Sequence, residues 1–374
     1  MRIGIVGLPN AGKSTLFNAL TQAGAQVASY PFTTIDPNVG IVPVPDPRLD
    51  RIASIVKPEK VTPATVEFVD IAGLVKGASR GEGLGNRFLG HIREVDAIAH
   101  VIRCFTNPDV SHVSGNLNPV LDAEIVETEL ILADIETVKK RRDKAAKMQK
   151  SGDRHYQEET ILMDRLKGEL EGGKPAKLIP LSDEEKACIQ SLFLLTMKPV
   201  VYVANIGEND LKDSAAYLRV LTEWIQSRGE NAPVVAISAR LESELADLTP
   251  DEAQEYLQEL GMESSGLKKL VIAAYSALDL ITFYTTKGTE TRAWTLRRGE
   301  TAFEAAGKIH TDMQRGFIKA EVIRYEDLVS AGSFAEAREK GLLRQEGREY
   351  PVQDGDVILF RFSQPPRTEV RGLR

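Results

Sequence analysis

Cysteine is scarce in this 374-residue sequence, where Cys104 and Cys188 are the only two. They lie in separate apolar segments with no short spacing between them, which argues against a disulfide framework or a cysteine-ligated metal. Long apolar runs are missing as well, and none reaches the roughly 18 residues of a membrane span. No signal-peptide pattern precedes the apolar run that begins at Ile3. We therefore expect a cytoplasmic protein with no membrane association.

A surplus of positive charge is also missing. The formal net charge is −7, the isoelectric point is near 5.5, and 27% of the residues are charged. Such a chain is a poor candidate for a dedicated nucleic-acid binder, although local basic patches can exist. Aromatic residues make up only 6%, but 42% of the residues are hydrophobic, enough for a sizeable core. The length suggests two or three domains of roughly 100–200 residues each.

Short β-branched runs separated by helix-like segments indicate an α/β sheet. The first run, Arg2–Gly7, ends in glycine and is followed by a helical pattern from Ser14 to Leu20. Four further strand-like runs follow: Val66–Ile71, Ala97–Cys104, Val200–Ala204 and Val234–Ile237. This alternation predicts a parallel sheet with crossover helices, which we assign to residues 1–121 and 198–278.

Residues 122–197 interrupt this alternation. They are rich in Glu, Lys, Ala and Leu, and their apolar residues recur at helical spacing with a break at Gly152. Ser182 and Glu185 form a capping box that predicts a last helix reaching Leu195. We expect a helical insertion of two antiparallel helices, coiled-coil-like in its apolar seam.

The pattern becomes β-rich after Asp279. Four runs resemble strands: Ile281–Thr286, Arg292–Leu296, Phe317–Tyr325 and Val357–Phe362. Two segments, Thr301–His310 and Ser333–Lys340, resemble helices. These elements predict a small α+β domain at residues 279–362, followed by a tail at residues 363–374.

The segment between the first strand and the first helix has the P-loop pattern Gly-x4-Gly-Lys-Ser in the context that the pattern requires. Gly7 and Gly12 let the backbone curl so that N–H groups cradle phosphate oxygens, and the helix adds its positive N-terminal end. Lys13 can neutralise the β- and γ-phosphates, and the Ser14 hydroxyl can ligate Mg²⁺. We predict nucleotide contacts from six consecutive residues: Asn10, Ala11, Gly12, Lys13, Ser14 and Thr15.

Switch-like elements follow the P-loop. Asp70 ends a strand, where its carboxylate can hold Mg²⁺ through water, and Gly73 allows the backbone to approach the γ-phosphate. Thr34 is a candidate Mg²⁺ ligand beside Ser14, in a loop ordered by the γ-phosphate. The glycine-rich segment 74–87 is predicted to be a mobile switch, with an ordinary flexible loop as the alternative.

Three segments carry a resemblance to a known family. They read GLPNAGKST at residues 7–15, YPFTT at residues 30–34 and DIAGLVKGAS at residues 70–79. They resemble the Obg-type branch of P-loop GTPases in the TRAFAC class, and within it the YchF or Obg-like ATPase subfamily, along essentially the whole chain. The resemblance implies that residues 279–362 form a β-grasp-like TGS domain. It also implies association with the ribosome, expected at the large subunit.

The loop expected to read the base departs from the usual GTPase pattern, Asn-Lys-x-Asp, whose Asp accepts two hydrogen bonds from guanine. This chain has Asn-Ile-Gly-Glu at residues 205–208, with an apolar residue for the lysine and a carboxylate one methylene longer. Without an aspartate placed to accept from guanine, the preference for guanine weakens. The resemblance implies that ATP is preferred over GTP. We place five residues of two loops beside the base: Asn205, Ile206, Glu208, Ser238 and Ala239.

The water-activating group is also unusual. Many GTPases carry a glutamine just after the Asp-x-x-Gly motif to orient the attacking water, but this position is Leu74. A candidate replacement is His112, since imidazole relays protons near neutral pH. A loop histidine alone is more often a plain surface residue, but the resemblance to the YchF subfamily assigns His112 the catalytic role. Asn10 resembles the asparagine of potassium-stimulated relatives, so K⁺ is a candidate cofactor beside Mg²⁺.

Basic residues gather in the insertion at Lys139–Lys144, with Lys147 and Lys150 beyond. The run fits a solvated helix face, and it also fits an RNA contact whose strength would fall steeply with salt. Aromatic and basic residues of the C-terminal module, among them Phe283 and Lys319, offer a second RNA platform, although aromatics in small β modules are usually core. We expect a monomer whose partners are ATP and the ribosome.

A ribosome-associated ATPase acting as a nucleotide switch is the leading hypothesis. The first alternative is a true GTPase of the Obg type. The second is a non-catalytic scaffold whose ribosome- or RNA-binding face depends on bound ATP. A metabolic kinase fits less well, because no second phosphate-acceptor site is visible while the switch elements at Thr34 and Asp70 are.

Overall fold

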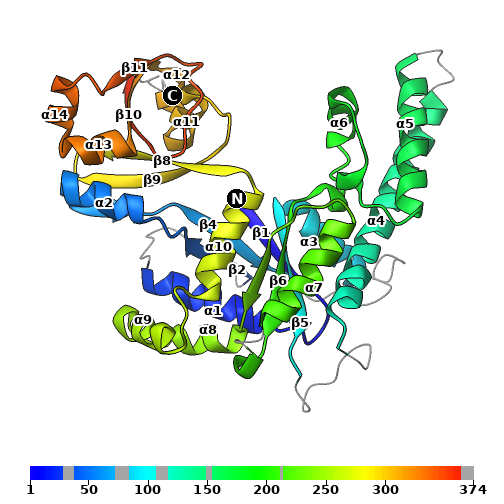
Figure 1. Cartoon of the computed structure of the whole chain (residues 1–374). Helices are drawn as coiled ribbons and strands as arrows, with labels where there is room; N and C mark the ends of the chain where they lie inside the picture. Colours follow the sequence, from blue (N-terminus) through cyan, green and yellow to red (C-terminus); the bar gives the residue numbers. More distant parts are fainter. Residues whose placement is uncertain (28–37, 72–83, 107–116, 149–153, 211–213, 364–374) are drawn as a thin grey trace, which may run out of the picture. The chain divides into compact units, whose positions relative to one another are not determined.

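The computed structural model of the chain describes residues 1–27, 38–71, 84–106, 117–148, 154–210 and 214–363. The chain divides into two compact units (Figure 1). One comprises residues 1–42 and 66–277, and the other comprises residues 43–65 and 278–374. Among the described residues, no helix is long and apolar enough to cross a membrane.

A six-stranded sheet with strand order β2-β4-β1-β5-β6-β7 forms the centre of the first unit. Its strands are β1 (Arg2–Val6), β2 (Val39–Pro43), β4 (Thr65–Asp70), β5 (Ala97–Cys104), β6 (Val200–Ile206) and β7 (Val234–Ile237). β1 pairs in parallel with β4 and β5, and β6 pairs in parallel with β5 and β7. Every residue of β5 is buried, as in a parallel strand covered on both faces. The predicted parallel α/β sheet is confirmed.

Helices flank this sheet, and α1 begins directly at the P-loop lysine (Figure 1). The helices of the sheet region are α1 (Lys13–Val27), α3 (Leu84–Glu94), α7 (Ser214–Ser227), α8 (Ala239–Leu245), α9 (Pro250–Glu259) and α10 (Gly266–Ala277), with a short 3₁₀ turn η5 (Glu208–Asp210). α10 contacts β6 and β7, and α3 contacts β1.

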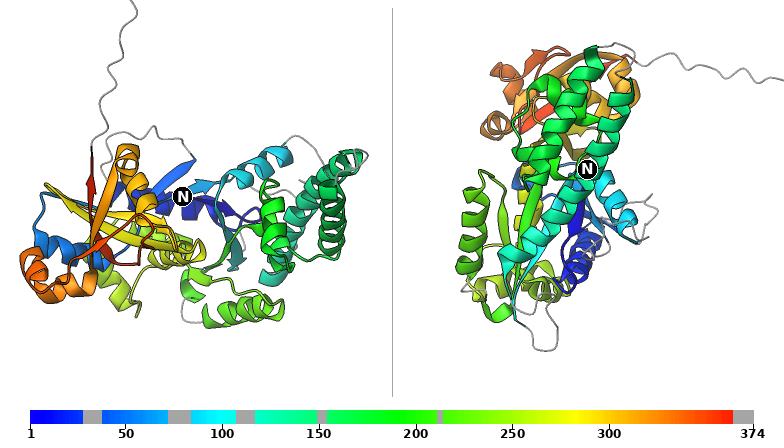
Figure 2. Two further views of the ribbon diagram at one scale, coloured as in Figure 1. Left: turned by 90° about the horizontal axis from the view of Figure 1, so that it is seen from above. Right: turned by 90° about the vertical axis from the view of Figure 1, so that its right-hand side faces the viewer.

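The helical insertion leaves the sheet between β5 and β6. Its elements are α4 (Pro119–Met148), α5 (Arg154–Glu171), the 3₁₀ turn η3 (Ala176–Leu178), α6 (Asp183–Gln190) and the 3₁₀ turn η4 (Leu195–Met197). α4 and α5 lie alongside each other (Figure 2) and bury an apolar seam that includes Val138, Met163 and Leu166. The predicted capping box of α6 is present, because Ser182 accepts from the Glu185 N–H and Glu185 accepts from the Ser182 N–H.

The last helix of the insertion is shorter than predicted, since α6 ends at Gln190 and not at Leu195. Phe193 has φ of 48°, a conformation that an α-helix does not contain. The N–H groups of Leu195 and Thr196 donate to the carboxylate of Asp134 on α4, at 2.7 and 2.8 Å. The Asp134 carboxylate therefore replaces the helical carbonyl oxygens as the acceptor for these N–H groups. The sequence of α6 does not indicate this contact, because Asp134 lies on another helix.

A second six-stranded sheet, with strand order β11-β10-β12-β8-β9-β3, forms the other unit. Its strands are β3 (Lys60–Thr62), β8 (Leu280–Lys287), β9 (Glu290–Arg297), β10 (Phe317–Arg324), β11 (Arg344–Glu346) and β12 (Asp356–Phe362). Its helices are α2 (Pro47–Val56), α11 (Ala302–Ile309), α12 (Thr311–Arg315), α13 (Tyr325–Ala331) and α14 (Phe334–Glu339). The predicted C-terminal α+β domain is confirmed. Phe283 is fully buried in its core, so this ring cannot serve as a surface platform for RNA.

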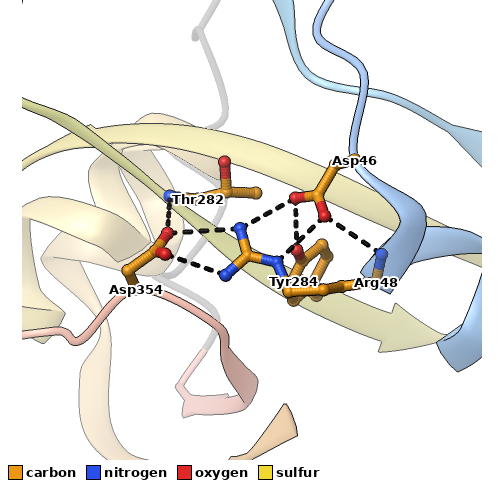
Figure 3. A network of polar contacts seen from close by, with 5 residues as sticks. All are labelled: Asp46, Arg48, Thr282, Tyr284 and Asp354. Carbon is orange, nitrogen blue, oxygen red and sulfur yellow. Dashed lines mark hydrogen bonds and ion pairs between the residues drawn. The ribbon is translucent and has the colours of Figure 1, made fainter. Parts of the chain in front are cut away.

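Residues 43–65 pack with the C-terminal module, although the sequence analysis assigns them to the nucleotide-binding domain. β3 adds a parallel edge strand to β9. Arg48 of α2 bonds to Asp46 and to Asp354, and the Tyr284 hydroxyl donates to Asp46 (Figure 3). The second unit is thus built from two separate stretches of chain, which local sequence patterns do not reveal.

Candidate nucleotide site

Close contacts define the loop between β1 and α1. Asn10 and Gly12 have φ of 62° and 90°, so the backbone turns in a way that exposes successive N–H groups on one side. A Cβ at Gly12 would lie 2.1 Å from Asn205 Nδ2, and a Cβ at Gly7 would lie 2.3 Å from the carbonyl oxygen of Val101. Glycine is therefore required at both positions because other parts of the sheet approach the loop so closely.

Lys13 and Asp70 bring opposite charges together at this loop. The Lys13 ammonium donates to the carbonyl oxygen of Leu8 at 2.8 Å, so the side chain folds back across the loop. Burial lowers the pKa of Lys13, and the nearby Asp70 carboxylate opposes that shift. Burial raises the pKa of Asp70, and the Lys13 charge opposes it in turn. A bound phosphate would give this buried cation the anionic partner that such a site favours.

Asn205 links three loops through one buried side chain at the end of β6. Its Nδ2 donates to the Ala11 carbonyl oxygen of the P-loop at 2.9 Å, and its Oδ1 accepts from the Ala239 N–H at 3.0 Å. The three loops follow β1, β6 and β7, which are parallel strands of one sheet. Ligands of open α/β sheets bind at the carboxyl ends of the strands, and these loops lie there.

The other predicted base-side residues differ in their surroundings. Ile206 is 2% exposed and packs in an apolar core cluster, so its side chain belongs to the core. Ser238 is buried and caps α8. Glu208 lies in η5, where its Oε1 is 3.1 Å from Nε of Arg240 on α8. The side chain that meets the Glu208 carboxylate is thus a cation from the neighbouring loop.

Two family models match the chain. Residues 2–150 match a family described as 50S ribosome-binding GTPase, and residues 280–363 match the YchF GTPase C-terminal family, described as a protein of unknown function. Together these matches cover the start of the nucleotide-binding unit and nearly all of the C-terminal module.

Relatives match almost the whole length. The Ribosome-binding ATPase YchF of Bacillus subtilis (strain 168) is 51% identical over 360 residues, which covers 96% of this chain and 98% of the relative. The protein of the same name from Escherichia coli O157:H7 is 48% identical over 362 residues, with 97% and 99% covered. The chain belongs to the YchF family. A solved structure, that of the Schizosaccharomyces pombe YchF GTPase, matches with a TM-score of 0.86 at 36% identity, covering 96% of this chain and 97% of that one.

For this YchF family member, the structure brings most of the predicted site together. Ser14 and Thr15 are exposed in the first turn of α1, beside the loop amides and Lys13. Thr34, Gly73 and His112 lie outside the described residues, so their predicted roles stay predictions.

Two features of the site in this YchF family member are not recognisable from its sequence. One is the double hydrogen bond through which Asn205 joins its neighbouring loops. The other is Arg240, because its ion pair joins residues that are 32 positions apart in the sequence. The only available signal was the position of Arg240 directly after the predicted base-contacting pair Ser238 and Ala239.

Proposed function

We propose that this chain is a cytoplasmic, ribosome-associated ATPase that binds and hydrolyses Mg²⁺–ATP, prefers it to GTP, and acts as a nucleotide-dependent switch in translation or stress regulation. The curated relatives that span the chain bear the name Ribosome-binding ATPase YchF. The first part of the chain also matches the family described as 50S ribosome-binding GTPase, which favours the large subunit as the partner.

The observation that carries the proposal is the loop arrangement around Asn205. This side chain holds the P-loop and the β7–α8 loop together. The loop proposed to bind the phosphates and the loops proposed to bind the base are therefore connected, and we call these three loops the Asn205 frame. The carboxylate on this frame is Glu208, one methylene longer than the aspartate that reads guanine. A site whose hydrogen bonds no longer match guanine loses much of its discrimination for that base.

The donor set suits Mg²⁺, which prefers oxygen ligands and keeps several waters. Ser14 offers an exposed hydroxyl in the first turn of α1, and Asp70 offers a carboxylate close to Lys13. We assign the metal to Ser14 and Thr34, with Asp70 acting through water and Gly73 contacting the γ-phosphate. Mg²⁺, when bound, neutralises charge on the β- and γ-phosphates. A requirement for K⁺ through Asn10 would appear as faster turnover in K⁺ than in Na⁺ buffer.

We assign hydrolysis to His112, the role that the resemblance to the YchF subfamily implies, since Leu74 cannot orient water. His112→Ala should lower ATP turnover by about 10²-fold or more, while the affinity for ATP stays near that of the wild type. His155→Ala, at an exposed histidine of α5, serves as the matched control and should keep full turnover. An unchanged rate in His112→Ala would remove the histidine from the mechanism.

RNA contact through the insertion is limited by internal ion pairs. Arg141 and Arg142 of α4 bond to Glu159 and Asp164 of α5, so these two arginines connect the helices. The exposed lysines of the same helix are left to meet phosphates: Lys139, Lys140, Lys144 and Lys147. Ribosome binding through them should weaken as salt rises.

The experiment that tests the proposal measures ATP and GTP binding by titration, and hydrolysis of each with and without ribosomes. We expect tighter binding and faster turnover of ATP, with ribosome co-sedimentation that depends on the nucleotide. Tighter binding of GTP would favour a true GTPase. Nucleotide-dependent co-sedimentation without any turnover would favour the non-catalytic scaffold. Failure to bind either nucleotide would refute the whole proposal.

A further inference from the structure

We propose that Arg240 sets the preference for ATP by occupying one of the two carboxylate oxygens of Glu208. The inference rests on the proposed function, because it names a residue that decides which base the same site accepts. Arg240 acts through Glu208 and is a positioning residue, not a catalytic one.

The contact between Arg240 and Glu208 lies within the Asn205 frame, the three loops that the Asn205 side chain connects. Arg240 is the second residue of α8, directly after Ala239, whose N–H donates to Asn205. Its Nε is 3.1 Å from Oε1 of Glu208 and 3.4 Å from Oε1 of Glu244. The guanidinium thus lies between two carboxylates, one from its own helix and one from the base-side loop.

Oε1 of Glu208 is turned away from solvent and accepts no hydrogen bond of good geometry within the described part of the chain. The arginine charge 3.1 Å away is what compensates this buried oxygen. An oxygen with no accessible surface cannot also meet a base, so Oε2 is the oxygen left to accept from a nucleotide. The Glu208 carboxylate therefore offers one acceptor where a free carboxylate offers two.

The number of acceptors separates the two bases. Guanine presents two adjacent donors on its Watson–Crick edge, N1–H and the N2 amino group, and a free carboxylate can accept from both. Adenine presents one donor there, the N6 amino group. A single available oxygen can accept from the one adenine donor, but it leaves one of the two guanine donors without an oxygen of its own, and an unmatched donor in a site that excludes water costs affinity.

The size of the effect is modest, because 78% of the Arg240 side chain is exposed and solvent screens the pair. One hydrogen bond gained or lost corresponds to a change in Kd of about three- to tenfold. Removing Arg240 should therefore tighten GTP binding by about three- to tenfold and change ATP binding by less than about twofold.

The test uses the full-length protein, free of nucleotide, and titrates it with the Mg²⁺ complexes of the β,γ-imido analogues of ATP and GTP. Arg240→Ala should lower the ratio of the GTP Kd to the ATP Kd. Arg240→Lys keeps a cation beside Glu208 and should keep a ratio near that of the wild type. Arg219→Ala is the matched control, because Arg219 is also a mostly exposed arginine that pairs with a glutamate on its own helix, Glu223.

The outcomes separate this inference from the proposed function. Wild-type protein that binds both analogues equally would refute the ATP preference itself. Wild-type preference for ATP together with an unchanged ratio in Arg240→Ala would overturn the role of Arg240 alone. Equal weakening of both analogues in Arg240→Ala would also overturn it, since that result indicates a purely structural residue.

Discussion

At the scale of single residues, Asn205 shows how a buried amide can organise a site whose loops come from distant parts of the chain. Its donor and acceptor are both used, on Ala11 and Ala239. The close approach of its Nδ2 also excludes any side chain at Gly12. The glycine of the P-loop and the asparagine of the base-side loop thus depend on each other sterically, although 193 positions separate them.

Asn205→Ala should weaken both folding and nucleotide binding. It leaves the Ala11 carbonyl and the Ala239 N–H without their partner, at about 1–3 kcal/mol for each buried group left unsatisfied. We expect ATP affinity to fall at least tenfold in a titration and the urea midpoint to drop. Asn205→Asp is the comparison that keeps the acceptor for Ala239 but replaces the donor to Ala11 with a carboxylate oxygen, which repels the Ala11 carbonyl. Wild-type affinity in Asn205→Ala would contradict the linking role.

His100 makes the stability of the first unit sensitive to acid. It is 4% exposed on β5, and its ring lies 5.7 Å from that of Tyr202. Burial, together with the charges of Lys177 and Lys13, lowers the pKa of His100 from 6.5 to about 3. His100 lines a small cavity together with Glu127, Lys177 and Tyr202. Between these two pKa values the unfolded chain binds a proton that the folded chain does not, so stability rises with pH there.

The resulting prediction compares wild type with His100→Gln in urea unfolding at pH 7, 6 and 5. From pH 7 to pH 5, the wild type should lose about 2 kcal/mol more than the variant, since each pH unit below 6.5 costs about 1.36 kcal/mol. Other titrating groups are common to both proteins and cancel in the difference. Parallel pH profiles would show that His100 is able to take up its proton in the folded state.

At the scale of secondary-structure elements, the root of the helical insertion depends on one carboxylate. Asp134 of α4 accepts from the N–H groups of Leu195 and Thr196 and from the Thr196 hydroxyl. Burial raises the pKa of Asp134, and the hydrogen bonds from Thr196 and Leu195 oppose that shift. The same helix connects to α3, where Arg93 donates to the Thr137 hydroxyl at 2.9 Å. The insertion is thus bonded to α3, which begins at Leu84, inside the segment 74–87 that the sequence predicts to be a mobile switch, so the last four residues of that segment are helical.

Asp134→Ala should weaken the attachment of residues 195 and 196 to α4 and lower the free energy of unfolding. Two buried N–H groups and a hydroxyl would lose their acceptor, which should cost about 2–4 kcal/mol of unfolding free energy. Hydrogen exchange at Leu195 and Thr196 should accelerate in parallel. Asp143→Asn on the same helix is the control, because the Asp143 side chain is 52% exposed and should change stability by less than about 0.5 kcal/mol. Unchanged exchange at Leu195 in Asp134→Ala would contradict this account.

At the scale of the whole molecule, the second unit is discontinuous in sequence. Its α2 and β3 are supplied by residues 43–65, a segment that leaves the first sheet after β2 and returns to it at β4. β4 ends at Asp70, and β2 follows the predicted switch around Thr34. The chain therefore connects the second unit directly to both strands that border the predicted switches.

Arg48→Ala should destabilise the second unit in the full-length protein. Arg48 bonds to Asp46 at 2.9 Å and to Asp354 at 2.8 Å. Its removal leaves Asp46, whose side chain is only 9% exposed, without its cation. Because Arg48 and Asp354 are partly exposed, we expect a loss of about 1–3 kcal/mol. Hydrogen exchange should accelerate in β8 and β9.

The matched control for Arg48→Ala is Arg51→Ala, at an exposed arginine of the same helix. It should leave the exchange of β8 and β9 unchanged. Equal effects of the two variants would mean that helix propensity in α2, rather than the ion pairs of Arg48, decides the stability of this unit.

Local patterns predicted much of the fold. β5 and β7 lie where their apolar runs predict, because a strand inside a parallel sheet is covered on both faces and reads as a nearly continuous apolar run; β5 is buried throughout, and β7 alternates buried and half-buried residues. The short strand β3 was not recognisable, since three residues carry too little periodicity. The P-loop was recognisable because phosphate binding requires particular residues in contiguous order, whereas the contacts of Asn205 and Arg240 join residues far apart in the chain.

By itself, the sequence determined that this protein has the P-loop pattern and that residues 205–208 depart from the guanine-reading pattern Asn-Lys-x-Asp. These properties depend on the identity and order of neighbouring residues. Only the tertiary structure decided that residues 43–65 complete the second sheet, that α6 ends at Gln190, and that Arg240 lies against Glu208. Each of these features depends on a contact with residues that are distant in sequence, and such contacts form only when the chain folds.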